Sequence, residues 1–295
     1  MTAFLQLLFQ GLALGCVYAL VAVGFTVIYR ASQVINFAQG GLLMVGAYVV
    51  SVLATGAGLP FALAVAAAIA VLAAGCVAFQ QLVLQRVLGQ PVFVLVMITI
   101  GLSIAVDSAI PAIFGGNARI LGDPWGASAV HAGGVTLSWV RIWTIACTAA
   151  VLGAYFAFDR FSRYGLAMRA TASDQEAALA VGVPIRRVYA LTWAIAGAVA
   201  AIGGVFLSGF PSSVNPSLGD VALRAFPAII LGGLDSLPGA VVGGVVIGVV
   251  EVLTSGYAPG WLGNNFSDVA PYVVMIAVLL VRPYGLFGTR PVERV

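Results

Sequence analysis

The chain has 295 residues, of which 62% are hydrophobic and 8% are charged, and its mean hydropathy is +1.10. Soluble globular domains contain about 25% charged residues, so this composition excludes that class. The net charge of +3 comes from scattered arginines with no lysine, which excludes an extended basic face for nucleic acid. The composition predicts a helical protein that crosses a membrane several times.

Apolar runs of about 20 residues recur along the chain, and each is long enough to cross about 30 Å of hydrocarbon as a helix. Segment 221–234 is shorter, and Arg224 and Pro227 interrupt it, so we expect a half-helix or a re-entrant segment. Segment 33–41 is expected to be irregular as well. An all-α fold with about eight transmembrane helices and short broken helices is predicted, from apolar segments at 4–28, 33–53, 60–84, 91–113, 139–158, 189–208, 221–234, 238–256 and 269–283.

Arginine placement predicts the orientation of the chain. The longest polar loop, at about 159–188, contains five of the 13 basic residues, whereas the loop at about 114–138 contains only Arg119. These loops fall on opposite sides when the spans alternate, and basic residues are enriched in cytoplasmic loops. We therefore expect loop 159–188 and the C-terminus in the cytoplasm, and the N-terminus and loop 114–138 outside.

The sharpest local pattern lies within loop 159–188. Ser173 and Glu176 have the spacing of a capping box, in which each side chain satisfies a backbone amide at the start of a helix. Gly182 is suited to end this helix, and Pro184 is suited to begin the next one. The pattern predicts a short helix just outside the membrane, which is either a docking element for a partner or a connector between two spans.

Polar residues inside apolar segments are candidates for a translocation path. Asn36 and Gln39 either line such a path or form hydrogen bonds between helices. Asp107 and Glu251 fall in the outer parts of two spans, where a packing or interfacial role and a contact with a substrate ammonium group are the alternatives.

Arg224 either attracts a substrate carboxylate or, as we prefer, pairs with Asp220 at helix spacing. The sequence has no paired nucleophile and base, no spacing of metal ligands, and no G-x-x-x-x-G-K-[ST] loop for nucleotide phosphates. We therefore expect neither an enzyme nor a bound metal or cofactor.

Four stretches together resemble one known family. They read INFAQG at 35–40, RATASDQEAALAVG at 169–182, LGGLDSLPGA at 231–240 and RPYGLFG at 282–288. Each stretch alone is a weak signal, but together they are specific, and the similarity runs essentially from end to end. The chain resembles the inner-membrane permeases of branched-chain amino acid ABC importers, in particular the LivH-like member of the permease pair.

This resemblance implies an ABC importer permease fold and a single transmembrane permease domain over residues 1–295, in the bacterial inner membrane. It also implies a complex with a second, related permease, two cytoplasmic ATPases that hydrolyse the ATP, and a periplasmic solute-binding protein. In such importers a Glu-Ala-Ala…Gly element docks into a cleft of the ATPase. The positions that take this role, with their cap and their flanking basic residues, are Arg169, Ser173, Glu176, Ala177, Ala178, Gly182 and Arg187.

The candidate positions for the path through the membrane are Asn36, Gln39, Asp107, Pro227 and Glu251. The chain departs from the family at Gln39 and Gly41, where histidine and an acidic residue are common. Urea, short amides and aromatic acids therefore stay open as solutes beside the branched-chain amino acids. The alternative function is an ion-coupled secondary transporter, which would bind its ion at Asp107, Glu251 or Arg224.

Overall fold

The computed structural model describes residues 2–87, 90–126, 128–132, 135–209, 213–258 and 266–289. It confirms the helical membrane architecture, because seven of the described helices are long and apolar enough to cross a membrane, and Phe266–Val281 is a shorter apolar helix. Helices satisfy their own backbone polar groups, as hydrocarbon requires. The chain forms two compact units, which we describe separately: unit 1 is Met1–Thr26, Ala127–Thr148 and Arg224–Val295, and unit 2 is Val27–Gly126 and Ala149–Leu223.

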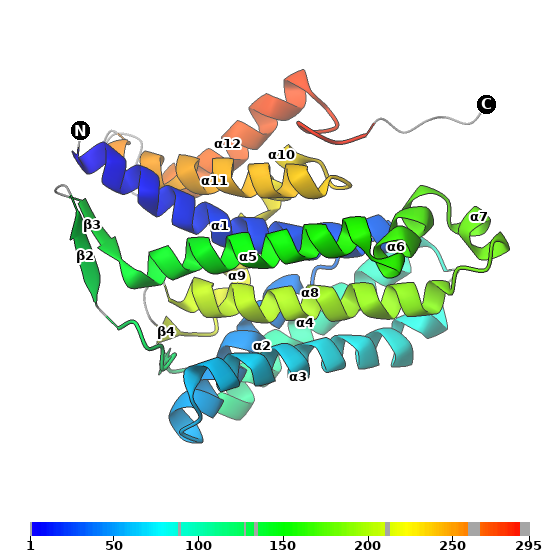
Figure 1. Cartoon of the computed structure of the whole chain (residues 1–295), viewed down its shortest axis with the longest axis horizontal. Helices are drawn as coiled ribbons and strands as arrows, with labels where there is room; N and C mark the ends of the chain where they lie inside the picture. Colours follow the sequence, from blue (N-terminus) through cyan, green and yellow to red (C-terminus); the bar gives the residue numbers. More distant parts are fainter. Residues whose placement is uncertain are drawn as a thin grey trace. The chain divides into compact units, whose positions relative to one another are not determined.

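Unit 2 is organised around α8 (Ile185–Ser208), which packs against α2 (Gln39–Ser51) and α3 (Phe61–Leu82) (Figure 1). Small residues allow these backbones to approach closely. A Cβ atom added at Gly46 of α2 would lie 2.7 Å from the Cα of Ala201 in α8. Because lipid offers no hydrophobic drive for association between helices, such close contact stabilises the packing of α2 on α8.

Helix α4 (Val92–Phe114) also belongs to unit 2, is long enough to cross a membrane, and packs against α2. Most of its apolar surface is exposed, and in a membrane such a face contacts lipid or another transmembrane chain. The shorter elements of the unit are η1 (Val52–Gly56), η2 (Leu84–Val87), α6 (Arg163–Ser173), α7 (Gln175–Ala180), α9 (Leu218–Arg224) and the antiparallel pair β1 (Arg119–Ile120) and β4 (Ser213–Val214). Two helices pass from one unit to the other, α1 (Thr2–Ser32) and α5 (Trp139–Phe161).

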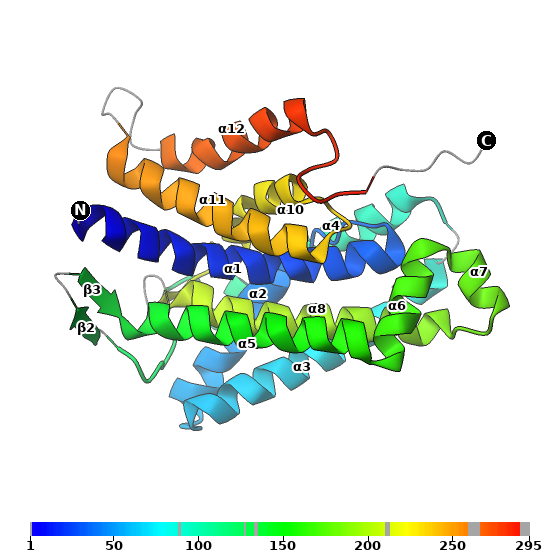
Figure 2. The ribbon, with the colours of Figure 1, turned by 45° about the horizontal axis from the view of Figure 1, so that its top comes forward.

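Unit 1 contains α10 (Phe226–Gly232), α11 (Leu237–Tyr257) and α12 (Phe266–Val281), which pack against one another. The first part of α1 runs beside α11 in both views (Figures 1 and 2). A Cβ atom added at Gly15 of α1 would lie 2.7 Å from the Cα of Val245, so a larger residue at this crossing would push the two helices apart.

Short strands lie in and after the loop at 114–138, and the all-α prediction lacked them. A hairpin of β2 (Ala129–Ala132) and β3 (Val135–Ser138) precedes α5 in unit 1. In unit 2, the Trp125 ring packs against Phe61 and Phe206, with ring centroids 5.3 and 6.0 Å apart. These strands are too short to give a period-2 hydrophobic pattern in the sequence.

The structure confirms that both segments expected to be irregular, 33–41 and 221–234, are interrupted. Residues 33–38 are non-helical, and Gln33 has a φ of 55°. Segment 221–234 is not one span, because α9 and α10 have seven residues each and end or begin beside the predicted interruptions at Arg224 and Pro227. Helix α8 begins at Ile185, directly after Pro184, as predicted from that proline, and so starts four positions before the apolar segment 189–208.

Candidate functional site

The short helix predicted in loop 159–188 exists, as α7, between α6 and the start of α8 (Figure 1). Its N-cap, however, is Asp174 and not Ser173, so the predicted capping box is wrong. The Asp174 carboxylate accepts a 3.0 Å hydrogen bond from the Ala177 backbone N–H. Helix α6 continues through Ser173, and the Asp174 N–H bonds the Ala170 carbonyl, so Asp174 is the first residue with the extended backbone of an N-cap.

The C-terminal end of α7 forms the predicted glycine stop. Gly182 has a φ of 86°, a conformation that costs glycine little and other residues more. The Val183 N–H bonds the Ala178 carbonyl and the Gly182 N–H bonds the Leu179 carbonyl, both at 2.9 Å, which is the Schellman pattern. Hydrogen bonds therefore fix both ends of α7 although the helix has only six residues.

Most side chains of α7 point away from the rest of unit 2. Ala178 is buried, whereas Glu176 and Ala177 are exposed. Leu179 is 56% exposed and Val181 is 79% exposed. Of the residues predicted to contact an ATPase, Ala178 therefore anchors the helix from inside. Apolar side chains grouped on an exposed short helix are typical of a protein-binding surface.

The segment that leads into α7 is also fixed by local contacts. The Ser162 hydroxyl accepts a 2.8 Å hydrogen bond from the Gly165 N–H and so caps α6, a helix that the sequence analysis missed. Asp159 at the end of α5 pairs with Arg169 at 3.4 Å and with Arg30 at 3.7 Å.

The two basic residues predicted to flank the coupling element, Arg169 and Arg187, differ in their ion pairs. Arg169 has a carboxylate partner within its own chain in Asp159. Arg187, in the first turn of α8, is exposed and forms no ion pair with the described residues.

Among the path candidates, Asn36 and Gln39 are fully buried in unit 2. The Asn36 amide donates to the Gln39 side-chain oxygen at 3.3 Å, and Gln39 donates to the Ala196 carbonyl of α8 at 3.4 Å. Thr99 of α4, a residue that the sequence analysis missed, accepts from the Phe37 N–H at 3.3 Å. Gln39 thus hydrogen-bonds the irregular segment to α8, a contact of the second kind expected for these amides, and a place on the translocation path stays a prediction for both.

Asp107 differs from these amides because its side chain is exposed on α4. It accepts a 3.3 Å hydrogen bond from Ser103, one turn earlier on the same helix. A Cβ atom added at Gly41 or at Gly219 would lie 3.9 or 3.2 Å from its carboxylate, so a glycine from each of two other elements lies beside it. No arginine pairs with Asp107 among the described residues.

The remaining path candidates, Pro227 and Glu251, belong to unit 1. Pro227 is buried in the first turn of α10. Glu251 of α11 accepts a 2.7 Å hydrogen bond from the Tyr18 hydroxyl of α1 and lies 3.6 Å from Arg224. Arg224 also bonds Asp268 of α12 at 2.8 Å, so its ion pairs are with these two carboxylates and not with the predicted Asp220.

Comparisons with known proteins agree with this architecture. The sequence profile of the family described as "Branched-chain amino acid transport system / permease component" matches residues 7–279. The permease LivH of the high-affinity branched-chain amino acid transport system of Salmonella typhimurium is 35% identical over 99% of this chain and 98% of its own length. The corresponding BraD permease of Pseudomonas aeruginosa is 32% identical over the same shares.

A more distant relative is the probable branched-chain amino acid transport permease LivM of Methanocaldococcus jannaschii, 25% identical over 64% of this chain and 59% of its own length. No solved structure matches the chain. The family match and the end-to-end similarity identify a transport protein and not an enzyme. The chain belongs to the family of branched-chain amino acid transport permeases, the membrane-spanning subunits of ABC importers.

Proposed function

We propose that the chain acts as one permease domain of an importer for small aliphatic amino acids, and that α7 is the element through which partner ATPases act on it. The observation that carries this proposal is the pairing of a rigid backbone with an exposed surface in α7. Asp174 and Gly182 fix the two ends of the helix, while Glu176, Leu179 and Val181 are exposed.

The path of the coupling follows the packing of unit 2. A displacement of α7 passes directly to α8, because the Schellman turn and Pro184 leave no flexible linker between the two helices. Helix α8 packs against α2 and α3, so its tilt alters the surroundings of the irregular segment 33–38. Hydrolysis of ATP on the partners thereby drives a rearrangement of the permease.

Four further partners complete the transporter that we propose: a second, related permease as the heterodimer partner, two ATPases, and a periplasmic solute-binding protein. LivM-type relatives support the second permease, since the family contains more than one kind of permease chain. The exposed apolar face of α4 supports a membrane neighbour of this type. The names of the LivH and BraD relatives favour branched-chain amino acids over urea, short amides and aromatic acids.

The orientation that we propose puts α7 and the C-terminus in the cytoplasm and the N-terminus outside, in the bacterial inner membrane. The excess of arginine in loop 159–188 supports this orientation. Cysteine labelling at position 173, with Ser173→Cys in a background without Cys16, Cys76 and Cys147, tests it. A membrane-impermeant maleimide should react in inverted vesicles and not in intact cells, and the reverse pattern would invert the topology.

The function itself is tested by affinity purification of the tagged chain from native membranes. Recovery of a second permease and two ATPases, with uptake that depends on ATP and on the binding protein in proteoliposomes, is the expected result. Recovery of the chain alone, with uptake driven by a proton or sodium gradient, would mean that the chain is a secondary transporter and that α7 is only a connector.

A further inference from the structure

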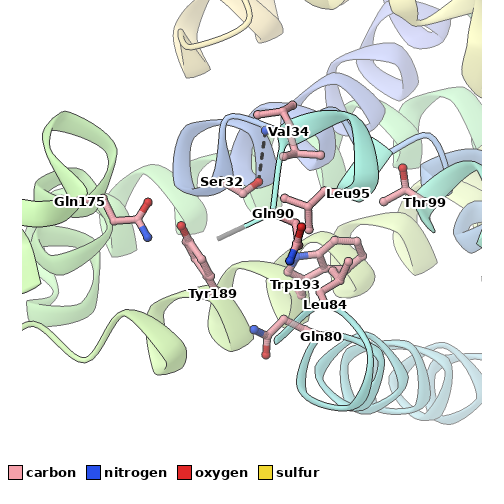
Figure 3. Close-up of a pocket in the computed structure, with 11 residues that line it drawn as sticks. Ser32, Val34, Gln80, Leu84, Gln90, Leu95, Thr99, Gln175, Tyr189 and Trp193 are labelled. Carbon is pink, nitrogen blue, oxygen red and sulfur yellow. Dashed lines mark hydrogen bonds between the residues drawn. The ribbon is translucent and has the colours of Figure 1, made fainter. Parts of the chain in front are cut away.

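A cavity of about 260 Å³ lies in unit 2 next to the coupling segment (Figure 3). Its walls come from the ends of α1 and α3, from the start of α4, from α8, and from Gln175, the first residue of α7. In Figure 3, the side chains of Gln175 and Tyr189 point toward each other. The cavity therefore touches the element that we assign to ATPase coupling.

The cavity has two kinds of wall. Leu84, Leu95 and the Trp193 ring form an apolar wall. Three glutamines, Gln80, Gln90 and Gln175, supply amide groups, and no charged side chain contributes to the described lining. Gln90 and Gln175 are exposed, so the cavity opens to solvent on their side.

Gln80 differs from the other two glutamines because, in the described part of the chain, its amide group is buried and unpaired. Its side chain is 1% exposed, and neither its amide nitrogen nor its amide oxygen has a hydrogen-bond partner among the described residues. Buried amides in folded proteins are nearly always paired, because removing both groups from water without compensation is costly. Gln80 lines the cavity, so a polar molecule bound there would supply the missing partners.

The chemistry of the walls indicates the class of that molecule. An amide donates through its NH₂ group and accepts through its oxygen, so it bonds both a carboxylate and an ammonium group. The apolar wall suits an aliphatic side chain. A volume of about 260 Å³ lies below the range of drug-sized pockets, which begins at about 300 Å³, and so fits a single small solute. A solute with a net charge would find no counter-ion in the described lining.

We propose that this cavity is a binding site for a zwitterionic aliphatic amino acid on the coupling side of the permease, and that its occupant restrains α7 through Gln175. The inference rests on the proposed function, because it takes the solute class and the role of α7 from there. It adds a consequence that transport alone does not require. Released solute that accumulates on this side slows the ATPases, so the importer senses its own product.

The test uses the purified complex in lipid nanodiscs without the binding protein, with tritiated L-leucine as the probe. Saturable binding is expected, and Gln80→Leu should weaken it at least tenfold because the paired amide groups are lost. The control is Gln81→Leu, the same substitution at the next position of α3, where the side chain is exposed and does not line the cavity. L-glutamate, which carries a net charge, should not compete with the probe.

The second readout is the ATPase rate of the same complexes. L-leucine should lower it in the wild type and in Gln81→Leu, but not in Gln80→Leu. Absence of saturable binding, or equal affinities and equal inhibition in the two variants, would overturn the inference. The proposed function has its own readout in the uptake assay: intact uptake without cavity binding rejects this inference alone, whereas failure of the chain to assemble with ATPases rejects the proposed function.

Discussion

The Tyr18 hydroxyl donates a 2.7 Å hydrogen bond to the Glu251 carboxylate, across 233 positions of the sequence. This bond joins α1 to α11 where their glycines bring the backbones together, and Arg224 faces the same carboxylate at 3.6 Å. A carboxylate buried in a membrane segment without such partners would be strongly destabilising. Glu251 therefore holds unit 1 together, and a path role for it is not needed to explain its presence in the span.

Removal of the hydroxyl by Tyr18→Phe should lower the free energy of unfolding by about 1.5–3 kcal/mol, the range for hydrogen bonds to charged groups. Thermal melting of the purified permease in detergent measures this loss. Tyr257→Phe is the control, because Tyr257 is the last residue of α11, the helix that carries Glu251, and is 58% exposed. Equal melting temperatures for the two variants would show that the bond contributes nothing to stability.

The N-cap of α7 distinguishes the two neighbouring cap candidates. Asp174→Ala should weaken the helix by about 0.5–2 kcal/mol, the usual cost of losing a cap. Ser173→Ala should have little effect, because Ser173 is the last residue of α6. Hydrogen exchange of the amides in 175–180 reports the difference. Faster exchange in Ser173→Ala than in Asp174→Ala would show that Ser173, and not Asp174, is the N-cap of α7.

The C-terminal stop of α7 depends on backbone conformation alone. No heavy atom lies within 4 Å of a Cβ built at Gly182, so Gly182→Ala introduces no collision and only forces alanine into a φ of 86°. That strain costs about 1–2 kcal/mol, and Gly182→Asn should cost less because asparagine tolerates this region better. ATPase recovery in pull-downs should rank glycine first, then asparagine, then alanine. Equal recovery with alanine and asparagine would contradict this account.

The exposed charge of α7 is tested by reversal. Glu176→Arg should leave the permease in the membrane but reduce the ATPase that co-purifies, on the order of tenfold for a loss of about 1.4 kcal/mol. Asp220→Arg makes the same change of charge at an exposed position of α9, outside loop 159–188, and should not alter recovery. Similar losses in both variants would point to a general effect of charge.

Gln39 separates a packing role from a path role. Gln39→Leu leaves the Asn36 amide and the Ala196 carbonyl without their partner, so the melting temperature should fall with a loss of about 0.6–1.7 kcal/mol. Uptake per folded molecule should stay unchanged. Unchanged melting with reduced uptake would instead make Gln39 part of the path.

Much of the fold follows from hydrophobicity, because runs of about 20 apolar residues in a lipid environment have few alternatives to a helix. The irregular segment before α2 was predictable from Asn36 and Gln39, polar side chains that disturb such a run. Helix α6 was not, since segment 163–173 lacks an apolar run and its Ser162 cap is a common residue type. Helix α6 packs on α8, and packing between segments that are distant in the sequence leaves no local pattern from which the helix could be predicted.

The errors within the candidate site have the same origin. Ser173 and Asp174 are both suitable caps, and the end of the preceding helix decides which one acts. Spacing within one helix suggested Asp220 as the partner of Arg224, whereas the fold brings it Asp268 and Glu251 from α12 and α11. Thr99 escaped notice because a single threonine in an apolar helix is unremarkable until its neighbours are known.

The hydrogen bonds at the two ends of α7 have a consequence for substitutions in this helix. The residues that give the helix its shape are Asp174, Ala178 and Gly182, and the residues that a partner would meet lie between them on the outer side. The residues that determine the shape of the helix are thus different from those that a partner would contact. Under the docking role that we propose for α7, substitutions on the outer side would change the contact with the ATPase without unfolding the helix.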